Sequence, residues 1–308
     1  MCSIHRQTIF RSQVMQEYLH TTKRSLAMQE ELLISFMAND NTIKPGASAV
    51  NRSCDTMFSN FWPSPIAHFP AYLGFQCCRV SEVEGGSRCR ILARVILSPR
   101  ETATWLRLPA TLKRRREWLF GRLAAKDAVR LFLKEQHGLE LCPIDIEISA
   151  DEHGRPIVSG EVVDNFGSRL SISIAHSEGE AVAIAGECGH HPGVGVDVEH
   201  VDQNCDGLAR IALTESERTL VYRIRSWRRR EWLLRIWCAK EAVAKALGRG
   251  MAGCPLNLVV KDVEIETGRL AVGLAGKLAH QLSTYAGRHF TAYTGCEGSL
   301  VFASSLIN

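Results

Sequence analysis

The sequence has no apolar segment long enough to cross a membrane. None of its 308 residues lies in a run approaching the roughly 18 uncharged apolar residues of a spanning helix. Residues 1–13, MCSIHRQTIFRSQ, lack the apolar core of a signal peptide. We therefore expect a cytoplasmic protein that does not bind membranes.

The cysteines do not follow a disulfide or zinc-binding pattern. There are 11, an odd number, and no two are spaced as C-x-x-C. Cys142, Cys188 and Cys238 stand among apolar residues, and the vicinal Cys77-Cys78 pair is poorly suited to a zinc site by itself. We expect reduced, structural thiols.

Three familiar fingerprints are missing. Gly193-x-Gly195 lacks the third glycine of a dinucleotide-binding loop. No glycine stands five positions before Gly276-Lys277, and no Ser or Thr follows, which excludes a P-loop. His176-Ser177 is not part of a G-x-S-x-G elbow, so a serine hydrolase has no support.

The composition is that of a soluble globular protein with a substantial core. Hydrophobic residues make up 45% and charged residues 23%, and the length suits two modest domains. The net charge of +4 favours phosphates or an acidic partner. It is too small for a nucleic-acid-binding footprint, so we expect no nucleic-acid partner.

Local patterns predict alternating strands and helices after a polar N-terminal stretch. We expect a helix over 11–38, a linker to about residue 70, and a long helix over 112–136 that ends at Gly138. The predicted strands are 72–80, 88–97, 143–149, 170–174, 181–185, 194–199, 258–265, 268–274 and 299–304, and the further helices are 206–224 and 228–247. The capping pattern Thr214-Glu215-Ser216-Glu217 is interpreted as structural.

Two stretches suggest a site for a divalent cation and a polyphosphate. In the strand, Val194, Val196 and Val198 alternate with Asp197 and Glu199, which places two carboxylates on one face. In the helix over 228–247, Glu241 and Lys245 are four residues apart and share a face, with Lys240 beside them. Mg²⁺ prefers such oxygen ligands and completes its coordination with water and substrate phosphate oxygens. Taken alone, the same residues also fit a solvated strand and a surface ion pair.

The two stretches together resemble a known family. The pattern G-x-D-x-E, followed by W-x-x-K-E-x-x-x-K at Trp237–Lys245, resembles the signature pair of the 4′-phosphopantetheinyl transferases. The chain looks like the larger, pseudo-dimeric type typified by the surfactin-synthetase activator. The resemblance implies Mg²⁺-dependent transfer of 4′-phosphopantetheine from coenzyme A to a serine of an apo acyl or peptidyl carrier protein, with release of 3′,5′-ADP.

The resemblance also assigns roles to the signature residues. Asp197, Glu199 and Glu241 are the implied metal ligands, and Glu241 is the implied base that takes the serine proton directly or through water. Lys245 would stabilise or protonate the departing phosphate. Lys240 would lie near the phosphates or the incoming serine.

Further segments are implied to contact coenzyme A. Arg122, with Lys126 one turn later on the same helix, would bind its phosphates, because a guanidinium donates two parallel hydrogen bonds to phosphate. Arg155 and Pro156 match a G-K/R-P turn beside the adenine nucleotide. His176 matches the histidine of an S-x-S-H-S segment, although Ala175 replaces the serine before it and puts one phosphate contact in doubt.

The implied fold is α+β, with two similar subdomains in a pseudo-twofold arrangement behind an N-terminal helical extension. We predict an extension over 1–70, a first transferase subdomain over 71–191 and a second over 192–308. We find no clear sequence repeat, so the duplication is implied by the resemblance alone. We expect coenzyme A in the cleft between the two halves, and a monomer.

Other interpretations stay open. An inactive carrier-binding scaffold and a basic nucleic-acid-binding module both remain alternatives to an enzyme. The segment MQEYLHTTKRSLAMQEELL faintly resembles linker helices of multidomain synthases, which would put the carrier in the same polypeptide; a dispensable surface helix fits it too. The arginines at 223, 225 and 228–230 form either a docking surface for an acidic carrier or a solvated face.

Overall fold

The computed structural model describes the chain from residue 75 onward, with short gaps. The described residues are 75–81, 86–108, 111–164, 170–187, 193–201 and 206–307. The predicted helix over 11–38 and the linker that follows it lie outside them. Within the described part of the chain, no helix has the length and hydrophobicity of a membrane span.

The first half consists of an antiparallel sheet, a strand pair and a long helix. The sheet has the order β1-β5-β4, and β2 pairs with β3. The elements are β1 (Phe75–Ser81), α3 (Gly86–Ile96), α4 (Pro99–Arg107), α5 (Leu112–His137), a 3₁₀ turn (Pro143–Asp145), β2 (Glu147–Ala150), β3 (Pro156–Ser159), β4 (Leu170–Ser177) and β5 (Glu180–Glu187). Helix α5 packs on β1, β4 and β5 and ends at Gly138, whose φ of 66° is the left-handed value that a glycine accepts.

The second half repeats this order of elements with one additional short helix, and its strands form a single sheet. Its sheet has the order β6-β10-β9-β8-β7, and α8 packs on β6, β9 and β10. The elements are β6 (Gly193–His200), α6 (Asp206–Ala212), α7 (Glu215–Arg223), α8 (Arg229–Ala246), a 3₁₀ turn (Pro255–Asn257), β7 (Leu258–Glu264), β8 (Arg269–Leu274), α9 (Gly276–Gln281), β9 (His289–Glu297) and β10 (Leu300–Ile307). The α+β fold with two similar halves is therefore confirmed. The domain boundary between 191 and 192 stays a prediction.

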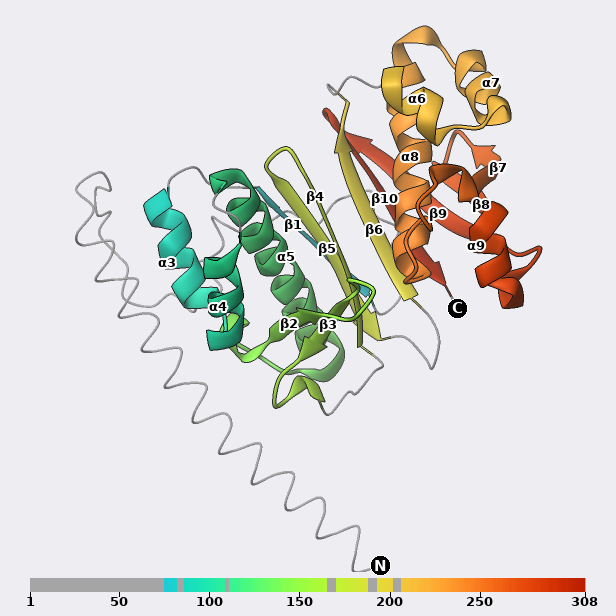
Figure 1. The fold of residues 1–308 in the computed structure, drawn as a ribbon. Helices are drawn as coiled ribbons and strands as arrows, with labels where there is room; N and C mark the ends of the chain where they lie inside the picture. Colours follow the sequence, from blue (N-terminus) through green and yellow to red (C-terminus); the bar gives the residue numbers. More distant parts are fainter. Residues whose placement is uncertain are drawn as a thin grey trace, which may run out of the picture. The chain divides into compact units, whose positions relative to one another are not determined.

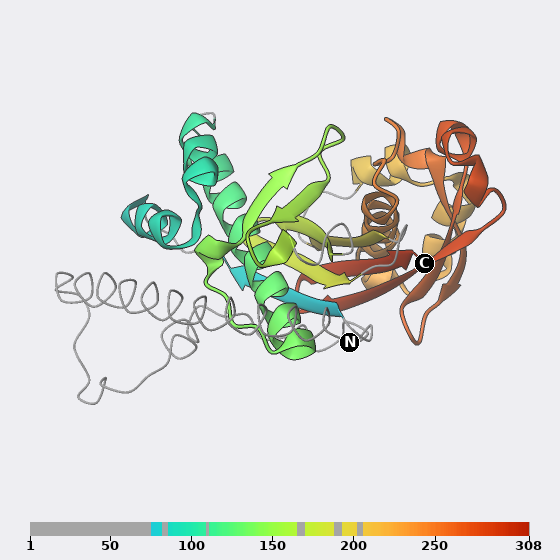
Figure 2. The same ribbon diagram turned by 90° about the horizontal axis from the view of Figure 1, so that it is seen from below.

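The two sheets pack against each other between the two long helices. Figures 1 and 2 both show β4, β5, β6 and β10 lying between α5 and α8. Side chains that alternate along these strands form a shared core of Ala175, Val182, Ile184, Val194, Val196, Val198, Leu300 and Phe302. The alternation predicted for the valines of β6 is correct, and their opposite neighbours face α8.

The duplication is also visible in the sequence, contrary to our expectation. The segment Arg-Arg-Arg-Glu-Trp-Leu stands at 114–119 in α5 and at 228–233 at the start of α8, where Arg228 is the N-cap. It is followed in the same register by Ala-Lys-Asp-Ala-Val at 125–129 and Ala-Lys-Glu-Ala-Val at 239–243. A Cys-Pro pair opens the 3₁₀ turn of each half, at Cys142 and Cys254. The repeat is interrupted by divergent positions, which hid it.

Each half is also held by the same buried ion pair. In the first half, Lys126 Nζ donates to Glu101 Oε2 at 2.5 Å and to the Ile96 carbonyl, while Glu101 also caps α4. In the second half, Lys240 Nζ donates to Glu217 Oε2 at 2.8 Å and to the Ala212 carbonyl, with Glu217 in the capping box of α7. The second oxygen of each glutamate accepts a strand amide, from Ile148 and Val260 respectively.

Some predicted elements are wrong. Residues 88–97 belong to helix α3, because Cys89, Ala93, Ile96 and Leu97 are buried at helical spacing. The predicted helix over 206–224 is two helices, since Thr214 begins a new one by capping it. The sequence pattern also missed β9, and β4 continues through His176, beyond the predicted end of that strand at residue 174.

Candidate functional site

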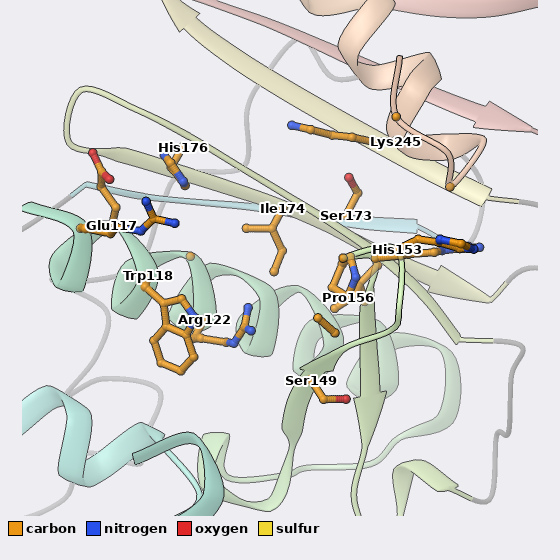
Figure 3. A pocket seen from close by; sticks show the side chains of 18 residues that line it. Glu117, Trp118, Arg122, Ser149, His153, Pro156, Ser173, Ile174, His176 and Lys245 are labelled. Atoms are coloured by element: carbon orange, nitrogen blue, oxygen red, sulfur yellow. The ribbon is translucent and has the colours of Figure 1, made fainter. Parts of the chain in front are cut away.

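A pocket of about 580 Å³ brings residues of both halves together. It is lined by Arg114, Glu117, Trp118, Gly121, Arg122, Ser149, Ala150, His153, Gly154, Arg155, Pro156, Ile172, Ser173, Ile174, His176, Lys245, Gly248 and Gly250. Figure 3 shows Lys245 reaching over it from α8, opposite Trp118 and Arg122 on α5. Five predicted site residues, Arg122, Arg155, Pro156, His176 and Lys245, therefore share one pocket.

Helix α5 supplies the guanidinium of Arg122, which is positioned by its neighbours but has one nitrogen without a hydrogen bond. Arg122 lies over the Trp118 ring at 4.5 Å, and its Nε is 3.9 Å from Glu101 Oε1. Burial lowers the pKa of Arg122, which Glu101 partly offsets. Its Nε is buried without a hydrogen-bond partner among the described residues. An anion in the pocket would supply that partner.

The turn between β2 and β3 places a second guanidinium. Asp151 Oδ1 accepts the backbone amides of His153 and Arg155, at 2.9 and 2.8 Å, which fixes the turn. The side chain of Arg155 then donates to Ser171 Oγ at 3.3 Å. His176, exposed on β4, adds a group that can donate to phosphate.

Lys245 connects this pocket to the carboxylates of β6. Its Nζ donates to Asp197 Oδ1 at 2.8 Å and to the Val196 carbonyl at 3.0 Å, and its side chain is 29% exposed. Burial lowers the pKa of Lys245, but the Asp197 carboxylate outweighs this effect and raises it above its ordinary value. Lys245 is therefore a stable cation at the pocket wall.

Glycines bring strand β6 close enough to α8 for this contact. A Cβ on Gly195 would meet the Ala242 carbonyl oxygen at 1.8 Å, and one on Gly193 would meet that of Ala246 at the same distance. Only glycine allows this approach. Asp197 and Glu199 follow Gly195 on the same face of the strand, so they lie against α8 beside Glu241.

Two of the three carboxylates, Glu199 and Glu241, have a raised pKa. Burial raises the pKa of Glu199 and of Glu241, and the Asp197 charge raises both further. Glu199 accepts hydrogen bonds from Ser177 Oγ at 2.9 Å and from the Trp237 indole at 3.3 Å. Asp197 Oδ2 is buried and accepts no hydrogen bond from any described residue.

These carboxylates are near one another but do not form a complete metal-coordination site. Among the described residues, no three His, Cys, Asp or Glu side chains are grouped closely enough to hold a metal ion as they stand. The buried, unpartnered Asp197 Oδ2 and the all-oxygen donor set nevertheless suit a hard divalent cation such as Mg²⁺.

Lys126 and Lys240 do not reach the pocket, contrary to our assignment of both to coenzyme A and of Lys240 to catalysis. Both are fully buried, and their ammonium groups are taken up by Glu101 and Glu217. Burial lowers the pKa of each lysine, and its glutamate works against that shift. Their position explains them as structural ion pairs.

Several pocket residues were not predicted. Trp118 precedes Arg122 by one helical turn, a spacing that could have identified it. His153 and the glycines that follow α8 gave no comparable sequence signal.

Fold and pocket define a protein built from two repeated halves, with a pocket lined by basic side chains from both. A family model, described as 4'-phosphopantetheinyl transferase superfamily, matches residues 193–293. A holo-[acyl-carrier-protein] synthase of Geobacillus kaustophilus is 41% identical over 96 residues, which cover 31% of this chain and 70% of that protein. One from Anoxybacillus flavithermus is 41% identical over 71 residues, 23% of this chain and 57% of the relative. The chain belongs to the 4′-phosphopantetheinyl transferase superfamily, and it is an enzyme of that class.

Solved structures of holo-[acyl-carrier-protein] synthases give weaker matches. The holo-[acyl-carrier-protein] synthase of Neisseria meningitidis is 19% identical with a TM-score of 0.32, covering 37% of this chain and 96% of that one. The enzyme of Bacillus anthracis in complex with CoA (3',5'-ADP) is 23% identical with a TM-score of 0.30, covering 38% and 97%. These scores are too low to add to the assignment.

Proposed function

We propose that this enzyme transfers 4′-phosphopantetheine from coenzyme A to a serine of an apo acyl or peptidyl carrier protein. The observation that carries the proposal is the pocket in which Arg122, Arg155 and His176 meet Lys245, which is itself bonded to Asp197. Three groups that can bind phosphate therefore lie beside a carboxylate cluster. Membership of the superfamily and two relatives named holo-[acyl-carrier-protein] synthase support the same conclusion.

The pocket residues would bind and orient the phosphates of coenzyme A. Arg122 and Arg155 offer planar donor groups, and burial of Arg122 beside Trp118 strengthens its interaction with an anion. Lys245, held by Asp197, is placed to stabilise negative charge on the departing phosphate. We place the coenzyme between the halves because the lining residues come from both.

The reaction forms a bond from the serine oxygen to the β-phosphorus of the diphosphate. The bond from that phosphorus to the bridging oxygen breaks, and its electron pair leaves on 3′,5′-ADP. Glu241 would accept the serine proton directly or through water, since burial and its acidic neighbours raise its affinity for a proton.

Asp197, Glu199 and Glu241 would hold Mg²⁺. When bound, the ion supplies charge neutralisation at the diphosphate. Ser177 and Trp237 position Glu199 through the hydrogen bonds already described. A monomeric, cytoplasmic enzyme with no nucleic-acid partner remains our prediction.

Mass spectrometry tests the proposal. A panel of apo-carrier proteins from fatty-acid, polyketide, nonribosomal-peptide and lysine pathways is incubated with the full chain, coenzyme A and Mg²⁺. At least one carrier should gain a phosphopantetheine arm, and its Ser→Ala variant should not. If no carrier in the panel is modified with active coenzyme A, the proposal is refuted. If a carrier gains the arm in EDTA without Mg²⁺, only the proposed requirement for the metal is refuted.

A further inference from the structure

The second half carries an exposed aromatic ridge that the first half lacks. Tyr222 at the end of α7 is 68% exposed, and Trp227 before α8 is 73% exposed, the highest values among the large apolar side chains described. Arg229 stacks on the Tyr222 ring at 5.5 Å and Arg228 on the Trp227 ring at 5.7 Å. We call these four residues the aromatic ridge.

Hydrogen bonds and an ion pair fix the two arginines of the aromatic ridge. Arg229 donates to the carbonyls of Tyr222 and Ile224, at 3.1 and 3.3 Å, which fixes the end of α7 against the start of α8. Arg228 is paired with Glu231 at 3.0 Å. The aromatic rings are therefore presented on an ordered surface rather than on a loose loop.

The first half shows which part of this arrangement is structural. There, Arg115 makes the same contacts to the carbonyls of Leu106 and Leu108 at the end of α4. The arginine is thus part of the repeated scaffold. Leu106 and Lys113 stand where the second half has Tyr222 and Trp227. The aromatic pair is an addition, and neither ring fills the core.

Physical chemistry favours a protein partner for such a surface. Tyr, Trp and Arg are the residues most enriched among those that dominate binding energy at protein interfaces. Exposed arginines at 223, 225 and 230 lie within three residues of Tyr222 or Trp227 in the chain, so the partner surface should be acidic with apolar side chains among its carboxylates.

We propose that the aromatic ridge docks the protein substrate through an acidic segment that carries apolar side chains. This rests on the proposed function, because it places the substrate protein of that reaction. Helix α8 begins at the ridge and carries Glu241 twelve residues later, about 18 Å along its axis. A small folded domain, roughly 30 Å across, spans that distance.

The test compares variants at equivalent positions of the two halves. In full-length enzyme, the double variant Tyr222→Ala/Trp227→Ala should raise the KM for the best apo-carrier at least about tenfold, with kcat and the KM for coenzyme A within about twofold. The control Leu106→Ala/Lys113→Ala should change none of these. A ridge variant with unchanged carrier KM, or with kcat alone reduced, overturns the proposal.

Charge reversal gives a second measurement. Arg223→Glu should weaken the carrier's association at low salt, and the difference should shrink as salt rises, whereas Arg107→Glu at the equivalent place in the first half should have no effect. An equal effect of both variants would contradict docking at this ridge.

Binding without chemistry separates this proposal from the proposed function. Calorimetry with Ser→Ala variants of the same carrier panel should detect binding to the wild-type chain that the Tyr222→Ala/Trp227→Ala variant loses. Binding that depends on the ridge, without any transfer, would support the docking proposal and refute the proposed reaction. Transfer with ridge-independent binding, or no binding of any carrier, would sink docking.

Discussion

The two halves keep the same buried ion pair but differ in what surrounds it. Lys126 with Glu101 and Lys240 with Glu217 have matching partners and matching backbone contacts. Next to them, Asp127 follows Lys126 where Glu241 follows Lys240. Cys78 faces Ala183 across the strand pair as Asp197 faces Ala303. Both halves share the scaffold, and among the described residues only the second half carries the acidic cluster.

The pocket differs between the halves in the opposite sense. The first half has space for a ligand beside its long helix, and the described part of the second half does not. Gly121 lines it, whereas the equivalent residue of α8 is Arg235. Arg235 is almost fully buried, donates to the Thr294 carbonyl at 3.0 Å and pairs with Glu231 at 2.8 Å. Its side chain fills the corresponding space. The first half thus provides most of the pocket lining, and the second half provides Lys245 and the carboxylates, which explains why a working site needs both.

The largest effect should come from neutralising the acid that follows the buried lysine in the second half, compared with the same change in the first half. Glu241→Gln should reduce kcat for carrier modification about 1,000-fold or more, since it removes a proton acceptor and an oxygen ligand. Asp127→Asn, at the equivalent position of α5, should leave kcat within about threefold. Steady-state assays of folded protein decide this, and comparable losses would erase the functional difference between the halves.

Breaking either ion pair should cost similar stability. Lys126→Met and Lys240→Met each leave a buried carboxylate without its partner, which costs about 3–5 kcal/mol in the free energy of unfolding. Urea denaturation measures this. The double variant Lys240→Met/Glu217→Leu should recover most of the loss, because no buried charge remains.

These variants also test the structural role of Lys240. The Lys240→Met/Glu217→Leu protein should retain transfer activity per folded molecule within about tenfold. A loss as large as that of Glu241→Gln would show that Lys240 acts in the reaction, as the sequence motif first suggested.

Filling the first-half pocket should impair binding of coenzyme A. Even a Cβ on Gly121 would lie 3.3 Å from the Ile174 side chain, so Gly121→Arg would place a long side chain where the ligand is expected. We expect about a 100-fold weaker Kd for coenzyme A by calorimetry. Leu131→Arg, on an exposed part of the same helix, is the control. Unweakened binding would place the coenzyme elsewhere.

The smallest effect concerns pH and the first half alone. Burial raises the pKa of Asp127 to about 8, although Arg130 and Lys126 work against it, and Cys78 is its other titratable neighbour. A carboxyl with a raised folded pKa binds more protons when folded, so its contribution to stability falls as pH rises from about 4 to about 8.

Asp127→Asn should remove that loss. The variant should gain at least about 1 kcal/mol relative to wild type between pH 5 and pH 8 in urea denaturation. A difference that does not change with pH would mean that Asp127 is ionised throughout.

The sequence predicted the chemistry of the site better than its boundaries. Local spacing predicted which side chains share a face, Asp197 with Glu199 on β6 and Glu241 with Lys245 on α8. The basic residues of the pocket were implied by the family resemblance. Lys126 and Lys240 do not line the pocket, and the sequence did not indicate this because their ion-pair partners lie 25 and 23 residues away.

The missed elements have a similar cause. Helix α3 contains Val95 and Ile96 in a short apolar run, which a strand also accepts, and only packing against α5 distinguishes the two. The repeat between the halves was hidden because the matching segments are separated by divergent residues such as Gly121 and Arg235. Tertiary contacts, which no single stretch encodes, decided each of these cases.

Gly195 has a practical consequence for recognising such enzymes in new sequences. Because any side chain there would collide with the backbone of α8, the residue acts as a spacer that sets the distance between two acid-bearing elements. A chain that keeps every acid and lysine of the signature but has alanine at this position would hold its carboxylates too far apart. Sequence searches that score only the charged residues of the signature would accept such a chain and wrongly predict that it is active.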